Sequence, residues 1–450
     1  MYFRQILHSD LGCASYLLAD RGEAVVVDPK WEVEQYVQAA EEAGARIRYV
    51  LETHHHADHV SGRARLSCLT GASTLLPTGP GQLGISAGEV VRIGDIELLA
   101  LGAPGHRPEH LAYLACRDGL PRMLLSGDSL LVGDVARPDL AVAAEDGARA
   151  LWHTLQRLCA LPEDVELWPA HVGGSLCASQ SASSETSSTI GQERLTNPLL
   201  AVGDVEAFTA EITRCTPARP PTVERVVALN RRGAQHPGPV GELDAADLAQ
   251  VLAAGMCVLD LRDPDSFDSG HVEGSINLPL LGRGLGTRAG WAAGQEESIE
   301  LIVPSLEEGR RATELLRAAG VWNLAGMSVA DPIAWWAAGL RVHSSDAVAP
   351  DGLAARVRAG EVTLVDVRDP AEWSGGHIPG SQSLPLSVLG DGRAAAESLQ
   401  APIAVVCASG VRAAVAASIL RRHTRQPVTR VSGGVDQMAQ LGLSLVEGSS

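Results

Sequence analysis

The segment Thr53-His54-His55-His56-Ala57-Asp58-His59 follows directly on a short apolar run that ends at Leu51. A strand that enters a loop so rich in imidazole and carboxylate groups can bring several of these side chains to one cation. Three more strand-like runs end in the same way, and they are followed by His106, Asp128 and His171. One such residue alone is often an ordinary hydrogen-bonded polar group. Together, four strand ends in this order predict a metal site.

Around these loops, the first two hundred residues alternate short strand-like runs with longer helix-like segments. Trp31 to Ala43 and Asp146 to Leu158 carry apolar residues at helical spacing, whereas Ala24 to Val27 is typical of a buried strand. This alternation predicts an α/β domain with its chemistry on loops. Proline-rich stretches at 216–221 and 237–239 indicate linkers and place a domain boundary near Pro237.

Composition narrows the functional classes. A chain of 450 residues is long enough for two or three domains. The net charge of −18 argues against a surface that coats nucleic acid or an anionic membrane. The first twenty residues contain neither a long apolar run nor a small-residue cleavage site, so we expect a cytoplasmic protein without a membrane span. The eight cysteines lack close pairs, which is typical of reduced thiols.

The second half of the chain contains an internal repeat. Asp260-Leu-Arg-Asp-Pro and Asp366-Val-Arg-Asp-Pro begin two segments that align without a gap, 106 positions apart. Gly270-His271 and Leu278-Pro279-Leu280 recur as Gly376-His377 and Leu384-Pro385-Leu386. This repetition predicts a duplicated domain of roughly a hundred residues.

A candidate nucleophile lies in the second copy of the repeat. The apolar run Pro402 to Val406 precedes Cys407-Ala408-Ser409-Gly410-Val411-Arg412, and a helix-like stretch follows from Ala413. At a helix N-terminus, the helix dipole, the loop N–H groups and Arg412 would favour the thiolate of Cys407. Ala408, Ser409, Gly410 and Val411 would then form a cradle for a persulfide anion.

The first copy lacks this equipment. At the aligned position it reads Ile302-Val-Pro-Ser-Leu-Glu-Glu-Gly-Arg310, without a cysteine, and its one cysteine, Cys257, lies in the strand-like run that leads to Asp260. We therefore predict that this copy is catalytically silent and acts as a scaffold.

The loops of the first two hundred residues resemble those of the metallo-β-lactamase superfamily, whose fold is an αββα sandwich. All seven expected positions are filled: His54, His56, Asp58, His59, His106, Asp128 and His171. A complete set also suits the dinuclear zinc hydrolases of that superfamily, such as the glyoxalase II thioesterases. The motif alone therefore does not choose the metal.

The context of the motif looks like the persulfide dioxygenase branch, especially the members fused to rhodaneses. The resemblance rests on Gly127 to Leu140 and on Trp168-Pro169-Ala170-His171 followed by Gly174-Ser175. It implies one ferrous ion per chain, held by His54, His106 and Asp128, with open positions for O2 and a substrate sulfur. His56, Asp58, His59 and His171 would orient these ligands or form a second metal site.

The same resemblance suggests two substrate contacts. Arg137 would bind an anionic thiol carrier, with a plain salt bridge as the alternative. Cys177 would touch the substrate sulfur, with an ordinary buried thiol as the alternative.

From about Pro350 onwards, the chain resembles the rhodanese sulfurtransferases, whose loop cysteine carries a sulfane sulfur. Four residues separate Cys407 from Arg412, whereas protein phosphatases with a similar cradle use a longer loop, so sulfur transfer is favoured over phosphate chemistry. Ala408 stands where many rhodaneses have a basic residue, which leaves open whether thiosulfate is the preferred donor.

These expectations give a multidomain protein of α/β and α+β class. A metallo-β-lactamase-fold domain would span 1–237, a rhodanese-like domain without the catalytic cysteine 238–345, and a rhodanese sulfurtransferase domain 346–450. The resemblances imply that a low-molecular-weight persulfide is oxidised with O2 to sulfite, and that Cys407 passes sulfur to this sulfite to give thiosulfate. The residues themselves support two separate sulfur-capable sites.

Two other functions stay open from the sequence. One is a dinuclear zinc thioester hydrolase of the glyoxalase II kind with rhodanese appendages. The other is a sulfur-binding or sensing module with a structural metal. The sequence does not identify the thiol that carries the persulfide, and a chain with several linkers is compatible with a homo-oligomer.

Overall fold

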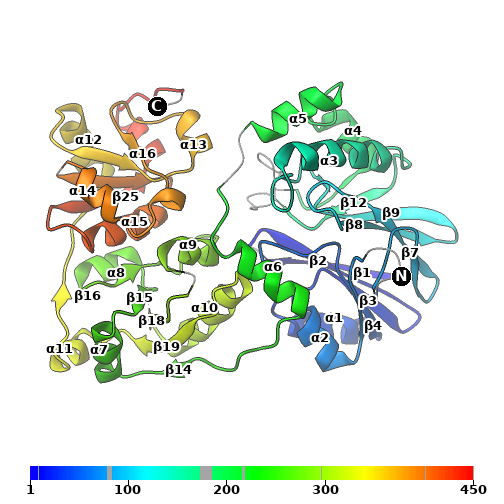
Figure 1. Ribbon diagram of the computed structural model, residues 1–450, viewed down its shortest axis with the longest axis horizontal. Helices are drawn as coiled ribbons and strands as arrows, with labels where there is room; N and C mark the ends of the chain where they lie inside the picture. The colour runs from blue at the N-terminus through cyan, green and yellow to red at the C-terminus, as the bar shows by residue number, and fades with distance from the viewer. Residues whose placement is uncertain are drawn as a thin grey trace. The chain divides into compact units, whose positions relative to one another are not determined.

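The computed structural model describes residues 1–8, 10–78, 84–172, 185–214, 218–294, 296–400 and 402–448. The chain divides into two compact units (Figure 1). Unit 1 comprises Met1–Pro217 and Val223–Pro237, and unit 2 comprises Ala218–Thr222 and Gly238–Ser450. Each unit has its own hydrophobic core and is described by itself.

The first sheet of unit 1 begins as an antiparallel meander and continues with parallel strands. Its strands, in spatial order, are β1 (Tyr2–His8), β2 (Cys13–Asp20), β3 (Glu23–Val27), β4 (Arg46–Leu51) and β5 (Ser73–Leu75). Helices α1 (Glu34–Glu42) and α2 (Arg63–Thr70) cover one face through a buried cluster that includes Tyr36, Val50 and Leu66. The central strands are covered on both faces, which explains apolar runs such as Ala24 to Val27.

The second sheet of unit 1 packs against the other face of the first. Its strands, in spatial order, are β13 (Ser188–Thr189), β12 (Glu166–Pro169), β9 (Leu120–Gly127), β8 (Leu111–Arg117), β7 (Ile96–Gly102) and β6 (Val90–Ile93). Val27 and Leu51 of the first sheet share a core cluster with Leu98 and Leu125 of the second. A short hairpin of β10 (Leu130–Leu131) and β11 (Asp134–Val135) follows β9.

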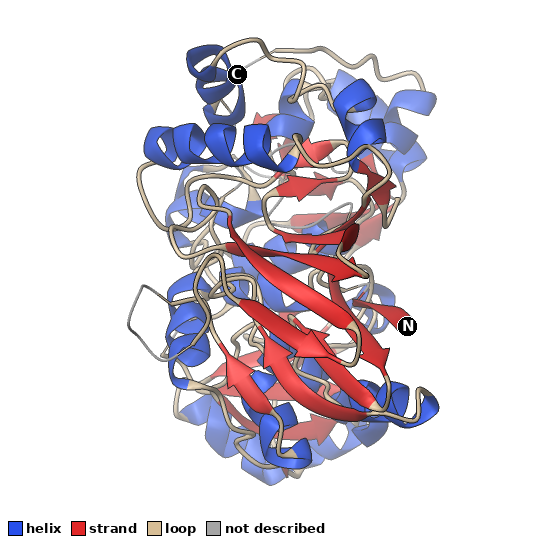
Figure 2. Cartoon of the chain, turned by 90° about the vertical axis from the view of Figure 1, so that its right-hand side faces the viewer, coloured by secondary structure: helices blue, strands red, loops and turns tan. Residues whose placement is uncertain are grey.

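Helices cover the outer face of the second sheet. They are α3 (Ala144–Leu158), α4 (Ile190–Thr196) and α5 (Val205–Thr213), and they pack through residues such as Leu151, Ile190 and Phe208. Two sheets between two helical layers make unit 1 an αββα sandwich, as predicted; its strands face the viewer in Figure 2. One further helix, α6 (Val223–Arg232), belongs to this unit.

The topology of the second sheet explains why distant residues meet. β7 and β9 both run antiparallel to β8, and β12 runs parallel to β9, so β7, β9 and β12 end at the same edge. The residues that follow these three strands include His106, Asp128 and His171.

Unit 2 contains two five-stranded parallel sheets of identical strand order. The first sheet has the order β14 (Gly241–Glu242), β19 (Leu324–Val329), β18 (Ile299–Val303), β15 (Cys257–Asp260) and β17 (Ile276–Asn277). The second has the order β21 (Ala347–Val348), β25 (Val428–Gly434), β24 (Ile403–Cys407), β22 (Thr363–Asp366) and β23 (Gln382–Ser383). The repeat in the sequence is therefore a repeat of fold.

Each sheet of unit 2 has its own set of helices. The first copy has α7 (Ala245–Ala253), α8 (Pro264–Ser269), α9 (Leu285–Ala292), α10 (Leu306–Ala318) and α11 (Pro332–Ala337), together with β16 (His271–Val272) paired to β20 (Val342–His343). The second copy has α12 (Pro350–Arg358), α13 (Pro370–Ser374), α14 (Arg393–Ser398), α15 (Val411–Arg421) and α16 (Val435–Gln440).

The repeated motif makes the same bonds in both copies. Arg262 binds the carboxylate of Asp260 at 2.6 Å and donates to the carbonyl of Gly270, and Arg368 does the same with Asp366 at 2.7 Å and Gly376. An aromatic ring also stacks on the repeated histidine in each copy. The ring centroids of Phe267 and His271 are 3.9 Å apart, and those of Trp373 and His377 are 3.8 Å apart. The motif thus ties the end of a strand to the loop behind it.

Among the described residues, no helix is long and apolar enough to cross a membrane.

Candidate functional site

Three side chains predicted to bind metal converge in unit 1. His54 follows β4, His106 follows β7, and Asp128 follows β9. The Oδ2 atom of Asp128 lies 3.6 Å from His54 Nε2 and 3.5 Å from His106 Nε2, and all three side chains are fully buried. A single cation could therefore be reached by one atom of each residue.

The unpaired atoms of this group fit a metal ion. Within the described residues, His54 Nε2, His106 Nε2 and Asp128 Oδ2 are buried without a hydrogen-bond partner. A buried polar atom left unpaired costs about 1–3 kcal/mol, so three such atoms aimed at one point need an explanation. Two imidazoles and one carboxylate are a suitable donor set for a divalent transition metal.

The other polar atom of each ligand is fixed by the protein. His54 Nδ1 lies 2.9 Å from Thr53 Oγ1, and His106 Nδ1 lies 2.9 Å from the carbonyl of Arg137. Asp128 Oδ1 lies 2.5 Å from His171 Nδ1. Contacts of this kind orient metal ligands before the ion arrives.

The charge states also suit a metal site. Burial lowers the pKa of His54 well below its usual value, and the neighbouring His56 and His110 lower it further. Burial likewise lowers the pKa of His106. For Asp128, burial alone would raise the pKa, but His171 outweighs it and the pKa falls. Neutral imidazoles beside an ionised carboxylate are the forms that bind metal.

His56 belongs to a different group. Its Nε2 lies 3.1 Å from Asp28 Oδ1 and 3.0 Å from Glu52 Oε2. Burial opposes its protonation, but these two carboxylates raise its pKa to about 9. His56 is therefore a cation near neutral pH that holds the histidine-rich loop against β3 and β4.

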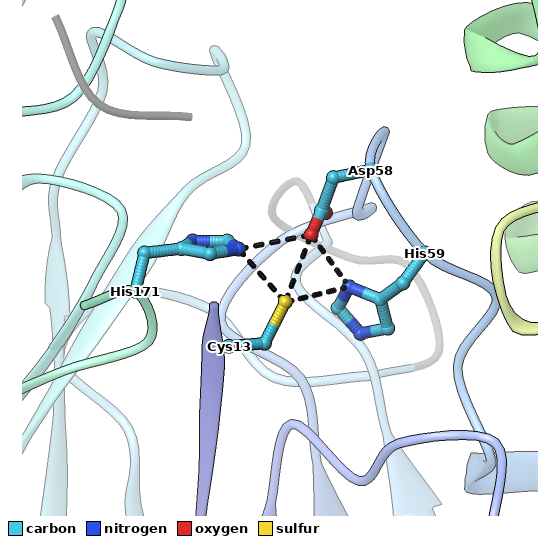
Figure 3. Close-up of side chains that lie close together, drawn as sticks. All are labelled: Cys13, Asp58, His59 and His171. Atoms are coloured by element: carbon cyan, nitrogen blue, oxygen red, sulfur yellow. Dashed lines mark hydrogen bonds and ion pairs between the residues drawn. The ribbon is translucent and has the colours of Figure 1, made fainter. Parts of the chain in front are cut away.

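Asp58, His59 and His171 form a second group, which also contains Cys13 (Figure 3). Asp58 Oδ2 lies 3.1 Å from Cys13 Sγ, 3.0 Å from His59 Nδ1 and 2.9 Å from His171 Nε2. Three donors thus crowd onto one carboxylate oxygen. His171 joins the two groups because its other nitrogen contacts Asp128.

Several site residues were missed by sequence reasoning. Cys13 pairs with His171 in an isolated β-bridge across 158 positions of sequence, and no local pattern signals this contact. Lys30 Nζ is buried 3.2 Å from His59 Nε2. His110 Nε2 accepts the N–H of Asp128 at 2.8 Å. The second histidine of Gly105-His106-x-x-x-His110 was a signal in the sequence.

Asn230 of α6 was also missed. Its amide donates to the carbonyls of His56 and His59 at 2.9 and 2.8 Å, and its Oδ1 accepts the N–H of Ser61 at 2.8 Å. A helix near the end of unit 1 thus fixes the loop on which the sequence motif lies.

Of the two predicted substrate contacts, Arg137 and Cys177, the structure describes only the first. The Arg137 side chain is buried and donates to both carboxylate oxygens of Asp139, at 2.7 and 2.8 Å. A buried ion pair thus holds the segment whose carbonyl orients His106. Cys177 lies outside the described residues.

In the second copy of the repeat, Cys407 ends β24 and its side chain is fully buried. The N–H of Gly410 donates to Cys407 Sγ at 3.1 Å. Gly410 has a φ of 87°, a left-handed conformation that favours glycine, and it precedes the first turn of α15. The chain therefore folds into a loop at a helix N-terminus around the thiol, as the sequence predicts.

Arg412 is more strongly engaged than the sequence suggests. Its guanidinium binds both carboxylate oxygens of Glu372 at 2.6 and 2.8 Å, and it also binds Asp369 at 3.1 Å. Burial alone would lower the pKa of Arg412, but Glu372 outweighs it and raises the pKa. Its charge is therefore shared with two carboxylates of α13 and its N-cap.

The first copy of the repeat has an ordinary helix start at this place. Ser305 caps α10, and its hydroxyl accepts the N–H of Glu308 at 3.2 Å. Cys257 is buried in β15, and burial raises its pKa to about 12. A thiol with this pKa is protonated and is a poor nucleophile near neutral pH.

Comparison with known proteins identifies a family for part of each unit. A model described as "Metallo-beta-lactamase superfamily" matches residues 8–171, and one described as "Rhodanese-like domain" matches residues 349–441. The persulfide dioxygenase ETHE1 of human mitochondria is 31% identical over 232 residues, which cover 50% of this chain and 85% of that protein.

Other relatives extend the comparison. A hydroxyacylglutathione hydrolase of Cereibacter sphaeroides is 30% identical over 234 residues, with 43% of this chain and 88% of that protein covered. A metallo-beta-lactamase of Staphylococcus aureus subsp. aureus COL, solved at 2.1 Å, has a TM-score of 0.65 and 27% identity, covering 73% of this chain and 99% of that one. This chain therefore belongs to the metallo-beta-lactamase superfamily and carries a rhodanese-like domain at residues 349–441.

Proposed function

We propose that unit 1 holds one ferrous ion on His54, His106 and Asp128, where a low-molecular-weight persulfide is oxidised with O2 to sulfite. The observation that carries this proposal is the set of three buried, unpaired ligand atoms, which come from three strand ends. Two histidines and one carboxylate leave open positions on iron for O2 and a substrate sulfur. The similarity to persulfide dioxygenase ETHE1 supports iron as the metal.

The overall reaction consumes one water. It is RSS⁻ + O2 + H2O → RSH + SO3²⁻ + H⁺, and bound iron would supply the activation of O2 and a binding position for the persulfide sulfur. The chain itself must orient the ligands, and His171 does so for Asp128 by contacting its Oδ1.

We propose further that Cys407 uses this sulfite as a sulfur acceptor. The transfer is Cys407–S–S⁻ + SO3²⁻ → Cys407–S⁻ + S2O3²⁻. The N–H of Gly410 and the N-terminal end of α15 stabilise negative charge on the sulfur. Arg412 is also held by Glu372 and Asp369, so these two carboxylates compensate part of its charge.

On this proposal, residues 1–237 form the persulfide dioxygenase domain and 346–450 the sulfurtransferase domain. Residues 238–345 form a rhodanese-like domain without a catalytic thiol. The buried, protonated Cys257 and the serine cap of α10 support the proposal that this domain has no sulfurtransferase activity.

A second candidate is a dinuclear zinc thioester hydrolase. Two observations favour it: the similarity to hydroxyacylglutathione hydrolases, and the second group of possible ligands at Cys13, Asp58, His59 and His171. Against it, the three donors on Asp58 Oδ2 leave that oxygen fully engaged within the protein, whereas the atoms of the first group are free to bind.

Metal content and two single variants test the proposal. We expect one iron per chain and persulfide-dependent O2 uptake in the unaltered protein. Cys407→Ser should keep O2 uptake and lose sulfur transfer, whereas His54→Ala should lose iron and O2 uptake but keep sulfur transfer. Two zinc ions per chain with thioester hydrolysis would favour the second candidate. Loss of both activities in either folded variant would contradict two separate sites.

A further inference from the structure

Unit 2 contains a large cavity far from Cys407. It has a volume of about 990 Å³ and lies between the two copies of the repeat. One wall comes from residues 271, 273–275 and 343–346, and the other from the C-terminal end of α15 and the loop that leads to β25. Cys407 precedes the other end of α15, a helix of 11 residues, so about 16 Å of helix separates the two places.

The walls of this cavity are held in a fixed arrangement. Asp268 of the first copy binds Arg421 at 3.4 Å and Arg430 at 2.9 Å in the second copy. The N–H of Asn277 donates to Ser418 Oγ across the same boundary at 2.9 Å. The two copies also share one hydrophobic core cluster. The cavity is therefore formed before any ligand arrives, which lowers the cost of binding.

The charge in the cavity is opposite to that of the whole chain. Four arginines and three histidines line it, against two acids, in a protein with a net charge of −18. Glu273 is already paired with Arg341 at 3.0 Å, and Arg421 with Asp268. Among the described residues, the guanidinium groups of Arg422 and Arg425 have neither a hydrogen-bond nor an ion-pair partner.

Neutral groups complete the lining. His423 Nε2 is buried and has no hydrogen-bond partner in the part of the chain that the structure describes. His271 Nδ1 lies 2.9 Å from the carbonyl of Phe267, which leaves Nε2 as an acceptor. Burial lowers the pKa of His271 to about 4, so it is neutral near pH 7. Such groups can pair with hydroxyl or amine groups of a ligand.

We propose that this cavity binds a phosphorylated small molecule of nucleoside diphosphate size, with its phosphates on Arg422 and Arg425. One guanidinium group can donate two parallel hydrogen bonds to the oxygens of one phosphate. Two arginines three positions apart can therefore bind a ligand that carries more than one negative charge. The cavity volume lies at the upper end of the range for small-molecule sites. It is therefore larger than one inorganic anion needs. The site is independent of the sulfur chemistry proposed above.

Calorimetric titration of the full chain with ADP, inorganic phosphate and adenosine tests this inference. We expect ADP to bind at least tenfold more tightly than either of the other probes, and to bind more weakly as salt is raised. Arg422→Ala/Arg425→Ala should weaken ADP binding by at least tenfold. Arg122→Ala/Arg311→Ala, which removes two exposed arginines elsewhere, should leave it unchanged. Cys407→Ser should bind ADP as the unaltered protein does.

Three results would overturn the inference. They are no measurable binding of ADP, binding no tighter than that of phosphate or adenosine, and equal weakening by the two double variants. The last would mean that ADP senses only the overall charge of the protein.

Discussion

At the scale of single residues, the candidate metal centre is a set of atoms oriented in advance. His54, His106 and Asp128 each use one polar atom to contact the protein and leave the other unpaired. His171 has the most central position, since it contacts Asp128 on one side and Asp58 on the other.

Replacement of His171 should therefore weaken metal binding without removing a ligand of the first group. We expect His171→Ala to lower metal affinity by about 10- to 100-fold, because Asp128 loses its 2.5 Å contact. Competition with a chelator measures this change. His153→Ala, at an exposed position on α3, is the matched control. Unchanged affinity in His171→Ala would mean that Asp128 needs no support.

At the scale of elements, α6 fixes the loop that carries the histidine motif. The one amide of Asn230 satisfies three backbone groups of that loop.

Removal of this amide should destabilise unit 1. Asn230→Ala leaves two carbonyls and one N–H unpaired in a buried region, and we expect a loss of about 2–4 kcal/mol in the free energy of unfolding. Urea denaturation of the metal-free protein measures the loss. Arg231→Ala, at the exposed neighbouring position, should change it little. An equal loss of unfolding free energy in both variants would contradict the stabilising role of the Asn230 amide.

A strand of unit 2 carries a buried carboxyl group that destabilises the folded state when it is ionised. Glu300 is fully buried in β18, and burial raises its pKa to about 7 from 4.5, although a hydrogen bond from Ser328 opposes the shift. A carboxyl with a raised pKa in the folded state destabilises the protein as the pH rises from about 4.5 through 7.

Glu300→Gln should therefore stabilise the protein at alkaline pH only. We expect a gain of about 1–2 kcal/mol at pH 8.5, where the native carboxyl is charged, and little change at pH 4.5. Thermal denaturation at the two pH values measures the difference. Glu307→Gln, on the exposed face of α10, removes the same charge and should show no such dependence. A gain that is equal at both pH values would contradict the titration of Glu300.

At the scale of the whole molecule, the two copies of the repeat behave as one structural unit. They share a core cluster, and Asp268 of the first copy contacts two arginines of the second. The side chain of Arg430 is only 4% exposed, so this ion pair is shielded from water and salt.

Asp268→Asn should loosen this junction. Removal of one partner from a buried ion pair costs up to about 3–5 kcal/mol, but Arg430 keeps a second carboxylate, Asp265 at 2.5 Å, so we expect a loss below this range. We expect a lower unfolding temperature for unit 2 and an unchanged one for unit 1, which differential scanning calorimetry can resolve. Asp351→Asn, at an exposed position on α12, is the control. A shift in both transitions would argue against separate units.

The sequence by itself determined the classes of fold and indicated candidate site residues that the structure brings close together. Metal-binding side chains after strands, and the Cys407 loop between a strand and a helix, are local patterns. A local pattern predicts local structure because the backbone conformations of strand, turn and helix depend mainly on neighbouring residues. The repeat at Asp260 and Asp366 was visible for the same reason, and it proved to be a repeat of strand order and of hydrogen bonds.

Only the tertiary structure decided which side chains meet. His56 lies in the same motif as His54, yet it pairs with Asp28 and Glu52 rather than with Asp128. Cys13 joins Asp58 and His171 through a strand pairing, and Asn230 reaches the loop from a distant helix. The cavity between the repeats exists only once the two copies pack together. Such contacts depend on packing between segments far apart in the chain, and no short stretch of sequence encodes them.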